Sequence, residues 1–316
     1  MTSQWQPGTS LPILRQRSRV FAELREFFQQ RQVLEVDVPV LASATVTDHN
    51  IESIQIRSPM AAGYLQTSPE YFMKRLLAAG SGDIYSLGKA FRDGESGSRH
   101  NPEFTLLEWY RCGWDEHQLM GEVADLIATL LPDIAVRRVT YAEVFYQHLQ
   151  LDPHLAELTT LQRLAVEMGS PAWADESRAN CLDLLFSVAV EPKLDAGLVL
   201  VYDYPACQAA LAKCAEDGQG RKVSRRFEAF LNRVELANGY CELTDAAEQA
   251  ARFAEDQRLR LESGKAKVAA DSRLLAAIQA GLPECAGVAL GVDRLLMQMV
   301  GVDALDQVMP FSWSRC

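Results

Sequence analysis

Residues 83–112 read DIYSLGKAFRDGESGSRHNPEFTLLEWYRC, and this stretch decides the fold. Two strand-like runs, 83–92 and 103–112, flank a polar segment rich in glycine, DGESGSRHNP. The pattern predicts an antiparallel hairpin with a long loop, and loops of this kind tend to carry functional residues. Hairpins rather than regular βαβ units favour an α+β fold with an antiparallel sheet over a doubly wound parallel sheet.

Hydrophobic periodicity outside the hairpin predicts the remaining elements. We expect helices over 14–30, 67–80, 115–131, most of 141–190, 245–263 and 271–280. We expect strands over 33–41, which carries Pro39, over 198–204, and twice within 226–243 with a break at Asn238-Gly239; residues 287–301 read as a strand, a glycine turn and a helix. The helical block of about 115–195 suggests a helical insertion in one catalytic domain spanning 1–316.

Composition limits the possible functions. The chain has 42 acidic and 31 basic residues, a formal net charge of −11, which argues against a broad phosphate-binding surface for nucleic acid. It contains no apolar run long enough for a membrane span and no signal-peptide pattern at its start, so we expect a cytoplasmic protein with no membrane partner. The seven cysteines include no C-x-x-C pair, so neither a disulfide framework nor a zinc site is indicated.

The loop of the hairpin carries groups suited to a nucleotide. Arg92 stands at the end of the first strand, where a guanidinium can grip a phosphate or carboxylate with two hydrogen bonds. Arg99 and His100 add polar groups for outer phosphates, and Phe104 offers a flat face on which a base can stack. Taken alone, Arg92 fits a surface salt bridge better than a functional role.

Two further segments carry candidate ligands. Glu235 and Glu242 lie seven residues apart in VELANGYCELTD, and two carboxylates on neighbouring strands can bridge Mg²⁺ ions that bind ATP. In GVALGVDRL (287–295), small residues allow a ligand close to the backbone, and Arg294 lies near a helix start. Ordinary strand-edge acids and a glycine turn with a solvated arginine are the alternatives.

Together these segments resemble the class II aminoacyl-tRNA synthetases. VLEVDVPVL, with Pro39, resembles their first motif at the dimer interface, FRDGE…RHNPEFTLLEWY the second, and GVALGVDRLL the third. TSPEYFMKRLLAAG, RHNPEFTLLEWY and ELANGYCELTDAAEQ resemble the lysine-binding segments of the lysyl-tRNA synthetases. The resemblance covers residues 14–312 and implies an antiparallel sheet flanked by helices, and a homodimer.

The resemblance also implies residue roles. Arg92 would hold the α-phosphate and the substrate carboxylate, and Arg294 would meet the γ-phosphate or stack on the base. Catalytic roles fall to Arg92, Glu235 and Arg294, and Mg²⁺ to Glu235 and Glu242. ATP would also meet Asp93, Gly94, Glu95, His100, Asn101, Phe104, Leu236 and Gly291, with Asn101 and Phe104 on adenine. Glu70 would bind the amino group near the carboxylate, Tyr110 and Glu242 the ε-ammonium with support from Glu108 and Asn238, and Ser68, Pro69 and Ala289 complete the amino-acid site.

One position departs from the family. The second motif normally reads F-R-x-E, but residue 94 here is glycine and the acid stands at Glu95. The contact to the adenine amino group is therefore assigned to Glu95 or to the loop backbone.

A lysyl-tRNA synthetase carries an anticodon-binding β-barrel ahead of this core. Here the predicted core helix begins at Leu14, so we expect no such barrel. A core of this kind resembles the bacterial enzymes that transfer an activated lysine isomer to a lysine side chain of elongation factor P. That resemblance implies ATP as substrate, Mg²⁺, (R)-β-lysine or lysine, elongation factor P as acceptor, and no tRNA partner.

Ala289 bears on the choice of isomer. Lysyl-tRNA synthetases have glycine at this position, and one extra methyl group in a tight pocket can disfavour α-lysine by roughly 1–3 kcal/mol. Two alternatives remain: a stand-alone enzyme that charges tRNA or another acceptor with lysine, and a non-catalytic regulatory paralogue. A hydrolase has little support, because the five histidines show no metal-ligand spacing and no G-x-S-x-G occurs.

Overall fold

The predicted hairpin is confirmed in the computed structural model, which describes residues 5–57 and 62–316. Strands β5 (Ile84–Phe91) and β6 (Glu103–Cys112) pair antiparallel, from Ile84 opposite Tyr110 to Phe91 opposite Glu103. Helices and mixed strands together give the expected α+β class. The chain divides into two compact units, Met1–Trp114 with Leu243–Cys316, and Asp115–Glu242.

The sheet of the first unit has the strand order β1-β5-β6-β12, with β1 at Leu34–Glu35 and β12 at Cys285–Gly291. The predicted strand over 33–41 is wrong. The structure has two strands of two residues each, β1 and β2 (Leu41–Ala42), and the segment with Pro39 that joins them is not a strand. Proline cannot donate a ladder hydrogen bond, which explains the interruption. A second sheet has the order β2-β4-β3, with β3 at Gln55–Arg57 and β4 at Ala62–Leu65.

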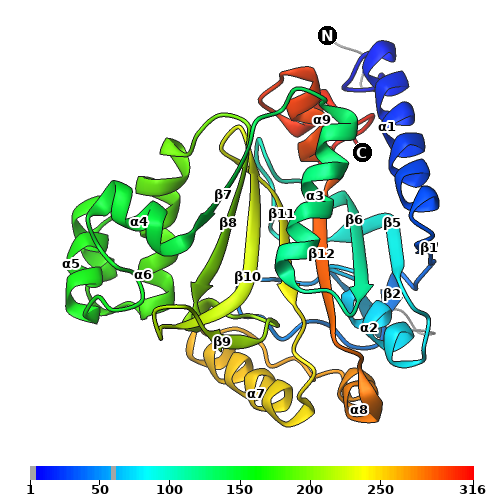
Figure 1. Cartoon of the computed structure of the whole chain (residues 1–316). Helices are drawn as coiled ribbons and strands as arrows, with labels where there is room; N and C mark the ends of the chain where they lie inside the picture. Colours follow the sequence, from blue (N-terminus) through cyan, green and yellow to red (C-terminus); the bar gives the residue numbers. More distant parts are fainter. Residues whose placement is uncertain (1–4, 58–61) are drawn as a thin grey trace. The chain divides into compact units, whose positions relative to one another are not determined.

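The α-helices described in the first unit are α1 (Leu11–Gln30), α2 (Glu70–Ala78), α7 (Ala246–Glu262), α8 (Ser272–Gly281) and α9 (Val292–Val300). Helix α1 leads into β1, and its C-terminal end lies beside β5 (Figure 1). There Phe28 stacks on Tyr85 at 4.4 Å and meets Trp109 edge-on at 5.3 Å. One face of β6 is thereby buried against α1. The predicted strand, glycine turn and helix over 287–301 are confirmed as β12 and α9, with Gly291 between them.

The sheet of the second unit has the order β11-β10-β8-β7, and β9 also pairs with β10. The bounds are β7 (Val136–Thr140), β8 (Leu198–Pro205), β9 (Cys214–Glu216), β10 (Lys222–Leu231) and β11 (Val234–Cys241). The predicted break at Asn238-Gly239 is wrong. The chain turns at Asn232 and Arg233, whose φ angles of 49° and 70° fit a two-residue hairpin turn, while Asn238-Gly239 lies inside β11.

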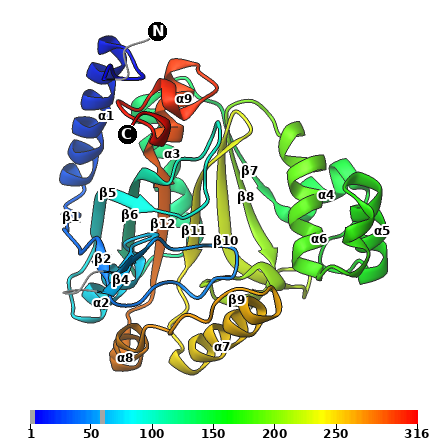
Figure 2. The ribbon, with the colours of Figure 1, turned by 180° about the vertical axis from the view of Figure 1, so that it is seen from behind.

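Helices α3 (Glu116–Leu130), α4 (Tyr141–Leu149), α5 (Leu158–Met168) and α6 (Arg178–Leu185) belong to the second unit. In both views α4, α5 and α6 gather beside β7 and β8 (Figure 1 and Figure 2). Tyr141, Phe145 and Phe186 stack in their core. The insertion over 115–195 stays a prediction, although these helices lie within it.

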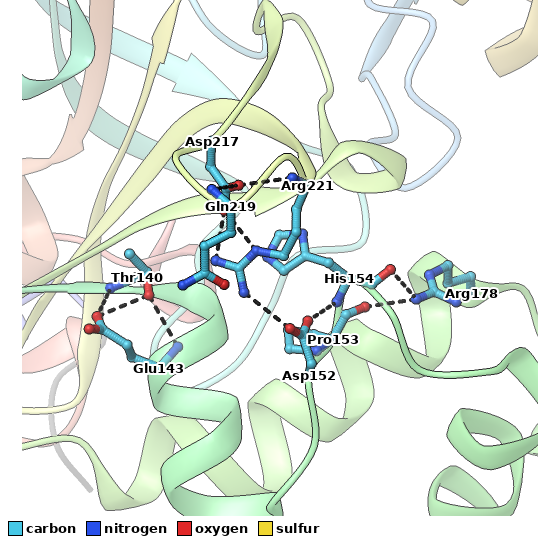
Figure 3. Close-up of polar contacts among 9 residues, drawn as sticks. All are labelled: Thr140, Glu143, Asp152, Pro153, His154, Arg178, Asp217, Gln219 and Arg221. Carbon is cyan, nitrogen blue, oxygen red and sulfur yellow. Dashed lines mark hydrogen bonds and ion pairs between the residues drawn. The ribbon is translucent and has the colours of Figure 1, made fainter.

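Two half-buried arginines hold the loops of this helical segment (Figure 3). Arg221, in the turn between β9 and β10, donates to Asp217 at 2.7 Å and to Asp152 at 3.1 Å. Arg178 donates to the carbonyls of Pro153 and His154 at 2.8 and 3.0 Å. The loop 152–154 is therefore held both by the β9–β10 turn and by α6.

Within the described part of the chain, no helix has the length and apolar character to cross a membrane.

Candidate active site

Strand β6 presents two polar side chains on the face turned away from α1. Alternate residues of a strand share a face, so Glu108 and Tyr110 lie opposite to Trp109. The hydroxyl of Tyr110 donates to Oε1 of Glu108 at 2.7 Å, and both side chains are buried. A buried carboxylate with a fixed hydroxyl is an arrangement that can accept an ammonium group.

Small residues flank this pair on both neighbouring strands. Gly287 and Ala289 of β12 stand opposite Tyr110 and Glu108, and Ser86 of β5 stands opposite Glu108 on the other side. Directly paired residues project to the same face with their Cβ atoms close together. The residues paired with Glu108 and Tyr110 therefore add little side-chain volume beside the Glu108 carboxylate. The methyl group of Ala289 stands directly opposite Glu108.

Glu70 occupies the first turn of α2. The helix begins at Glu70, with Pro69 as its N-cap, and Oγ of Ser68 accepts a hydrogen bond from the Glu70 N–H at 3.0 Å. The ammonium of Lys74 lies 2.6 Å from Oε1 of Glu70. Sequence reasoning missed Lys74, although its spacing of four residues from Glu70 on a predicted helix was a usable signal.

Arg92 and Phe104 meet at the base of the hairpin loop. The Arg92 guanidinium lies over the Phe104 ring at 5.1 Å, and 3.6 Å separates its Nη1 from the Glu95 carboxylate. Among residues 5–57 and 62–316, the buried Nε of Arg92 has no hydrogen-bond acceptor. The predicted cation and aromatic face are thus brought together, with one donor left for a ligand.

The glycine at position 94 has a conformational reason. Gly94 has a φ of +74°, in the left-handed region that favours glycine, and its neighbour Asp93 donates its N–H to the Glu52 carbonyl at 2.8 Å. A glutamate at position 94 would be strained in this turn. The acid one residue further on, Glu95, is the one that approaches Arg92.

Two loop residues are engaged within the protein. The Asn101 amide donates to the Glu103 carbonyl at 2.6 Å and accepts from the Trp313 N–H at 2.9 Å, so its side chain holds the loop to the C-terminal segment. Nη2 of Arg294 lies 2.9 Å from Nε2 of His100. Because arginine is only a donor, this contact needs an unprotonated His100 Nε2. Gly291 is the N-cap of α9.

In the second unit, a β-bulge decides which side chains share a face. Glu235 pairs with Phe230 and Ala237 with Ala229, so Leu236 is an extra residue in β11. In a regular strand, residues seven apart point to opposite faces; the extra residue shifts the alternation by one. Glu235 and Asn238 therefore share a face. Continued alternation from Asn238 turns Glu242 to the same face. The expectation that Glu235 and Glu242 lie on neighbouring strands is wrong, because Glu242 directly follows β11.

The same face carries residues that sequence reasoning missed. Glu228 accepts hydrogen bonds from the Tyr204 hydroxyl at 2.7 Å and from the Arg226 guanidinium, whose Nε also donates to Asn238 at 3.2 Å. Burial raises the pKa of Glu228 to about 7, with a further rise from Glu235 and opposition from Arg226. The alternation of Arg226 and Glu228 with Phe227 and Ala229 in the second half of β10 was the available signal.

The carboxylates on this face suit a hard cation. Within the described residues, no group of three or more histidine, cysteine, aspartate or glutamate side chains is gathered as a complete metal site. Mg²⁺ typically takes one or two protein carboxylates and completes its shell with phosphates and water. Glu235 is such a carboxylate on this face, whereas both oxygens of Glu228 already accept hydrogen bonds from Tyr204 and Arg226.

Comparison with known proteins covers nearly the whole chain. Residues 8–315 match the family described as tRNA synthetases class II (D, K and N). A Vibrio cholerae protein is 47% identical over 99% of both chains, a Vibrio parahaemolyticus protein 46% over 98% of both, and a Photorhabdus laumondii protein 45% over 99% of both. Each of the three is named elongation factor P–(R)-β-lysine ligase.

Proposed function

The chain belongs to the class II tRNA synthetases (D, K and N), and we propose that it is an ATP-dependent ligase that activates (R)-β-lysine and transfers it to elongation factor P. The observation that carries the proposal is the identity of 45–47% with ligases of that name over almost the full length of both chains. The acceptor group is a lysine side chain of elongation factor P, as the family resemblance implies.

The first unit supplies groups for both substrates. Glu108 and Tyr110 offer a buried acceptor for an ammonium group, and Glu70 accepts the amino group close to the substrate carboxylate. Arg92 holds the α-phosphate while Phe104 stacks on adenine, and Arg294 meets the terminal phosphate. Support for this assignment comes from the contact of Arg92 with Phe104 and from its unsatisfied Nε.

Within the second unit, Glu242 and Asn238 take the family role of ammonium binding. Glu235 and Glu242 would hold Mg²⁺, which would supply positive charge to the phosphates of ATP. Glu228 is not assigned to the ion, because its two oxygens accept hydrogen bonds from Tyr204 and Arg226.

The reaction has two steps. The substrate carboxylate attacks the α-phosphate, and pyrophosphate leaves; Arg92 orients the reacting groups and stabilises the charge that develops. The amine of the acceptor lysine then attacks the carbonyl of the adenylate, an amide bond forms, and AMP leaves. The acceptor amine must be neutral and must lose its proton during this step.

A homodimer is the proposed state of the enzyme, as the family resemblance implies. Leu34, Val40 and Leu41 support it, because these apolar side chains of the first-motif segment are 55%, 40% and 45% exposed. Light scattering tests the state directly, and a monomer at working concentration would refute it. A reaction with a translation factor supports the proposal of a cytoplasmic enzyme. The net charge of −11 supports the proposal that tRNA is not a partner.

Amino-acid-dependent ATP–pyrophosphate exchange tests the activation step. We expect strong exchange with (R)-β-lysine, weaker exchange with α-lysine, and a gain of one lysyl mass on elongation factor P in the same mixture. Exchange with α-lysine and lysylation of tRNA would instead establish the stand-alone charging enzyme. Absence of exchange with either isomer would refute the ligase.

A further inference from the structure

A buried arginine of α1 connects that helix to the third-motif helix α9. Nη1 of Arg17 lies 2.5 Å from Oδ1 of Asp293, and Nη2 donates to Oγ1 of Thr105 at 2.7 Å. The other oxygen of Asp293 accepts the backbone N–H of Thr105 at 2.6 Å. Three hydrogen bonds therefore close a ring among α1, β6 and α9.

The ring lies where the ladder between β12 and β6 ends. Gly291, the last residue of β12, stands opposite Leu106, so Thr105 is the first residue of β6 beyond the β12 pairing. The carboxylate of Asp293 takes the N–H of Thr105 there. Asp293 is 2% exposed, and a buried carboxylate is tolerated only when it is paired and hydrogen-bonded. Arg17 provides the charge.

Two members of this ring, Thr105 and Asp293, are next in sequence to residues assigned to ATP. Thr105 follows Phe104, the adenine platform, and Asp293 precedes Arg294, the residue assigned to the terminal phosphate. We propose that Arg17 is a positioning residue for ATP, which fixes the backbone on which Phe104 and Arg294 stand. This inference rests on the proposed function of those two residues.

The side chains near the amino-acid site lie outside the ring. Glu108 and Tyr110 are on the opposite face of β6 from Thr105, and Glu70 is on α2. Loss of Arg17 is therefore expected to affect the two substrates differently. General destabilisation of the fold would not produce such a difference.

The test compares Arg17→Met with Arg19→Met in ATP–pyrophosphate exchange. Arg19 is an exposed arginine of the same helix and serves as the matched control. We expect Arg17→Met to raise the KM for ATP about tenfold or more, because small displacements of positioning groups are costly. The KM for (R)-β-lysine should change less than about twofold. Arg17→Lys should recover part of the loss, and Arg19→Met should match the wild type.

A second variant covers the case in which Arg17→Met does not fold. Thr105→Val removes only the hydroxyl that Arg17 contacts and leaves the backbone bond to Asp293. It should raise the KM for ATP in the same direction. Equal rises in both KM values, or an unchanged KM for ATP with lowered thermal stability, would overturn the inference.

Calorimetric titration with ATP separates this inference from the proposed function. Failure of the wild type in exchange would refute the ligase. Weakened ATP binding by Arg17→Met, with unchanged binding by Arg19→Met, would still support the positioning role. Equal ATP affinity in all three proteins would overturn it.

Discussion

The ammonium of Lys74 lies 2.6 Å from Oε1 of Glu70, one turn earlier on α2, and its side chain is only 1% exposed. The side chain of Glu70 is 15% exposed, so the acid reaches the surface of the fold while its partner stays inside. Removing one member of a buried ion pair takes a partner away from the charge that stays inside, which costs more than removing both members.

This asymmetry predicts the stabilities of three variants. Glu70→Gln should lower the free energy of unfolding by roughly 1.5–3 kcal/mol, because the buried Lys74 ammonium loses its contact with the Glu70 carboxylate. Lys74→Met should cost less, and the double variant should recover most of the loss without recovering activity. Urea denaturation followed by fluorescence measures each value.

The exposed pair of Lys89 and Glu103 is the control for this set, since both side chains are at least 42% exposed. Glu103→Gln should change stability by about 1 kcal/mol or less. A double variant of Glu70 and Lys74 that is no more stable than Glu70→Gln would contradict the prediction.

The raised pKa of Glu228 predicts a pH dependence of stability. Burial raises the pKa from 4.5 to about 7, so between these values the folded protein holds a proton that the unfolded chain has released. The contribution of Glu228 to the free energy of unfolding is therefore present at low pH and is lost as pH rises from about 4.5 to about 7. The wild type should lose roughly 1–3 kcal/mol more than Glu228→Gln over that range.

Denaturation at several pH values measures the difference. Glu216→Gln, which alters an exposed acid on β9, should retain the pH dependence of the wild type. Parallel stability curves for the wild type and Glu228→Gln would show that Glu228 titrates normally in the folded protein.

How much the sequence could predict depends on the kind of signal. The β5–β6 hairpin followed from alternation on both sides of a polar loop, and β12 with α9 from a glycine turn before helical periodicity. The face shared by Glu235 and Asn238 did not, because it requires the extra residue at Leu236, which no local pattern marks. The Asn232-Arg233 turn was missed because Asn238-Gly239 is the stronger turn signal, although tertiary pairing keeps it inside β11.

Missed partners have a common physical cause. Lys74 and Glu228 act through contacts with other side chains. The separation of two residues along the chain predicts such a contact only when the face of the helix or strand on which they lie is known. Arg17 is further still, since its partner Asp293 is 276 residues away in the chain. The family motifs identified the residues assigned to the substrates. They did not identify the residues that hold those side chains in position.

Ala289→Gly should shift the preference between lysine isomers. The methyl group of Ala289 stands opposite Glu108, on the face assigned to the amino acid. Removing it should favour α-lysine over (R)-β-lysine by roughly 1–3 kcal/mol in the ratio of kcat/KM values. Pyrophosphate exchange with each isomer measures the ratio, and Ala286→Gly, on the other face of β12, is the control. An unchanged ratio would remove Ala289 from the specificity argument.

Arg92→Ala should abolish adenylate formation while the protein still folds. The guanidinium is held over Phe104 and near Glu95, and the main-chain N–H of Arg92, which donates to Pro102, does not depend on the side chain. Loss of a preorganised charge at the reacting phosphate should lower the exchange rate by about a hundredfold or more. Arg163→Ala, at an exposed arginine of α5, should leave the rate unchanged. Circular dichroism checks folding, and a folded Arg92→Ala protein that retains exchange would show that another residue holds the α-phosphate.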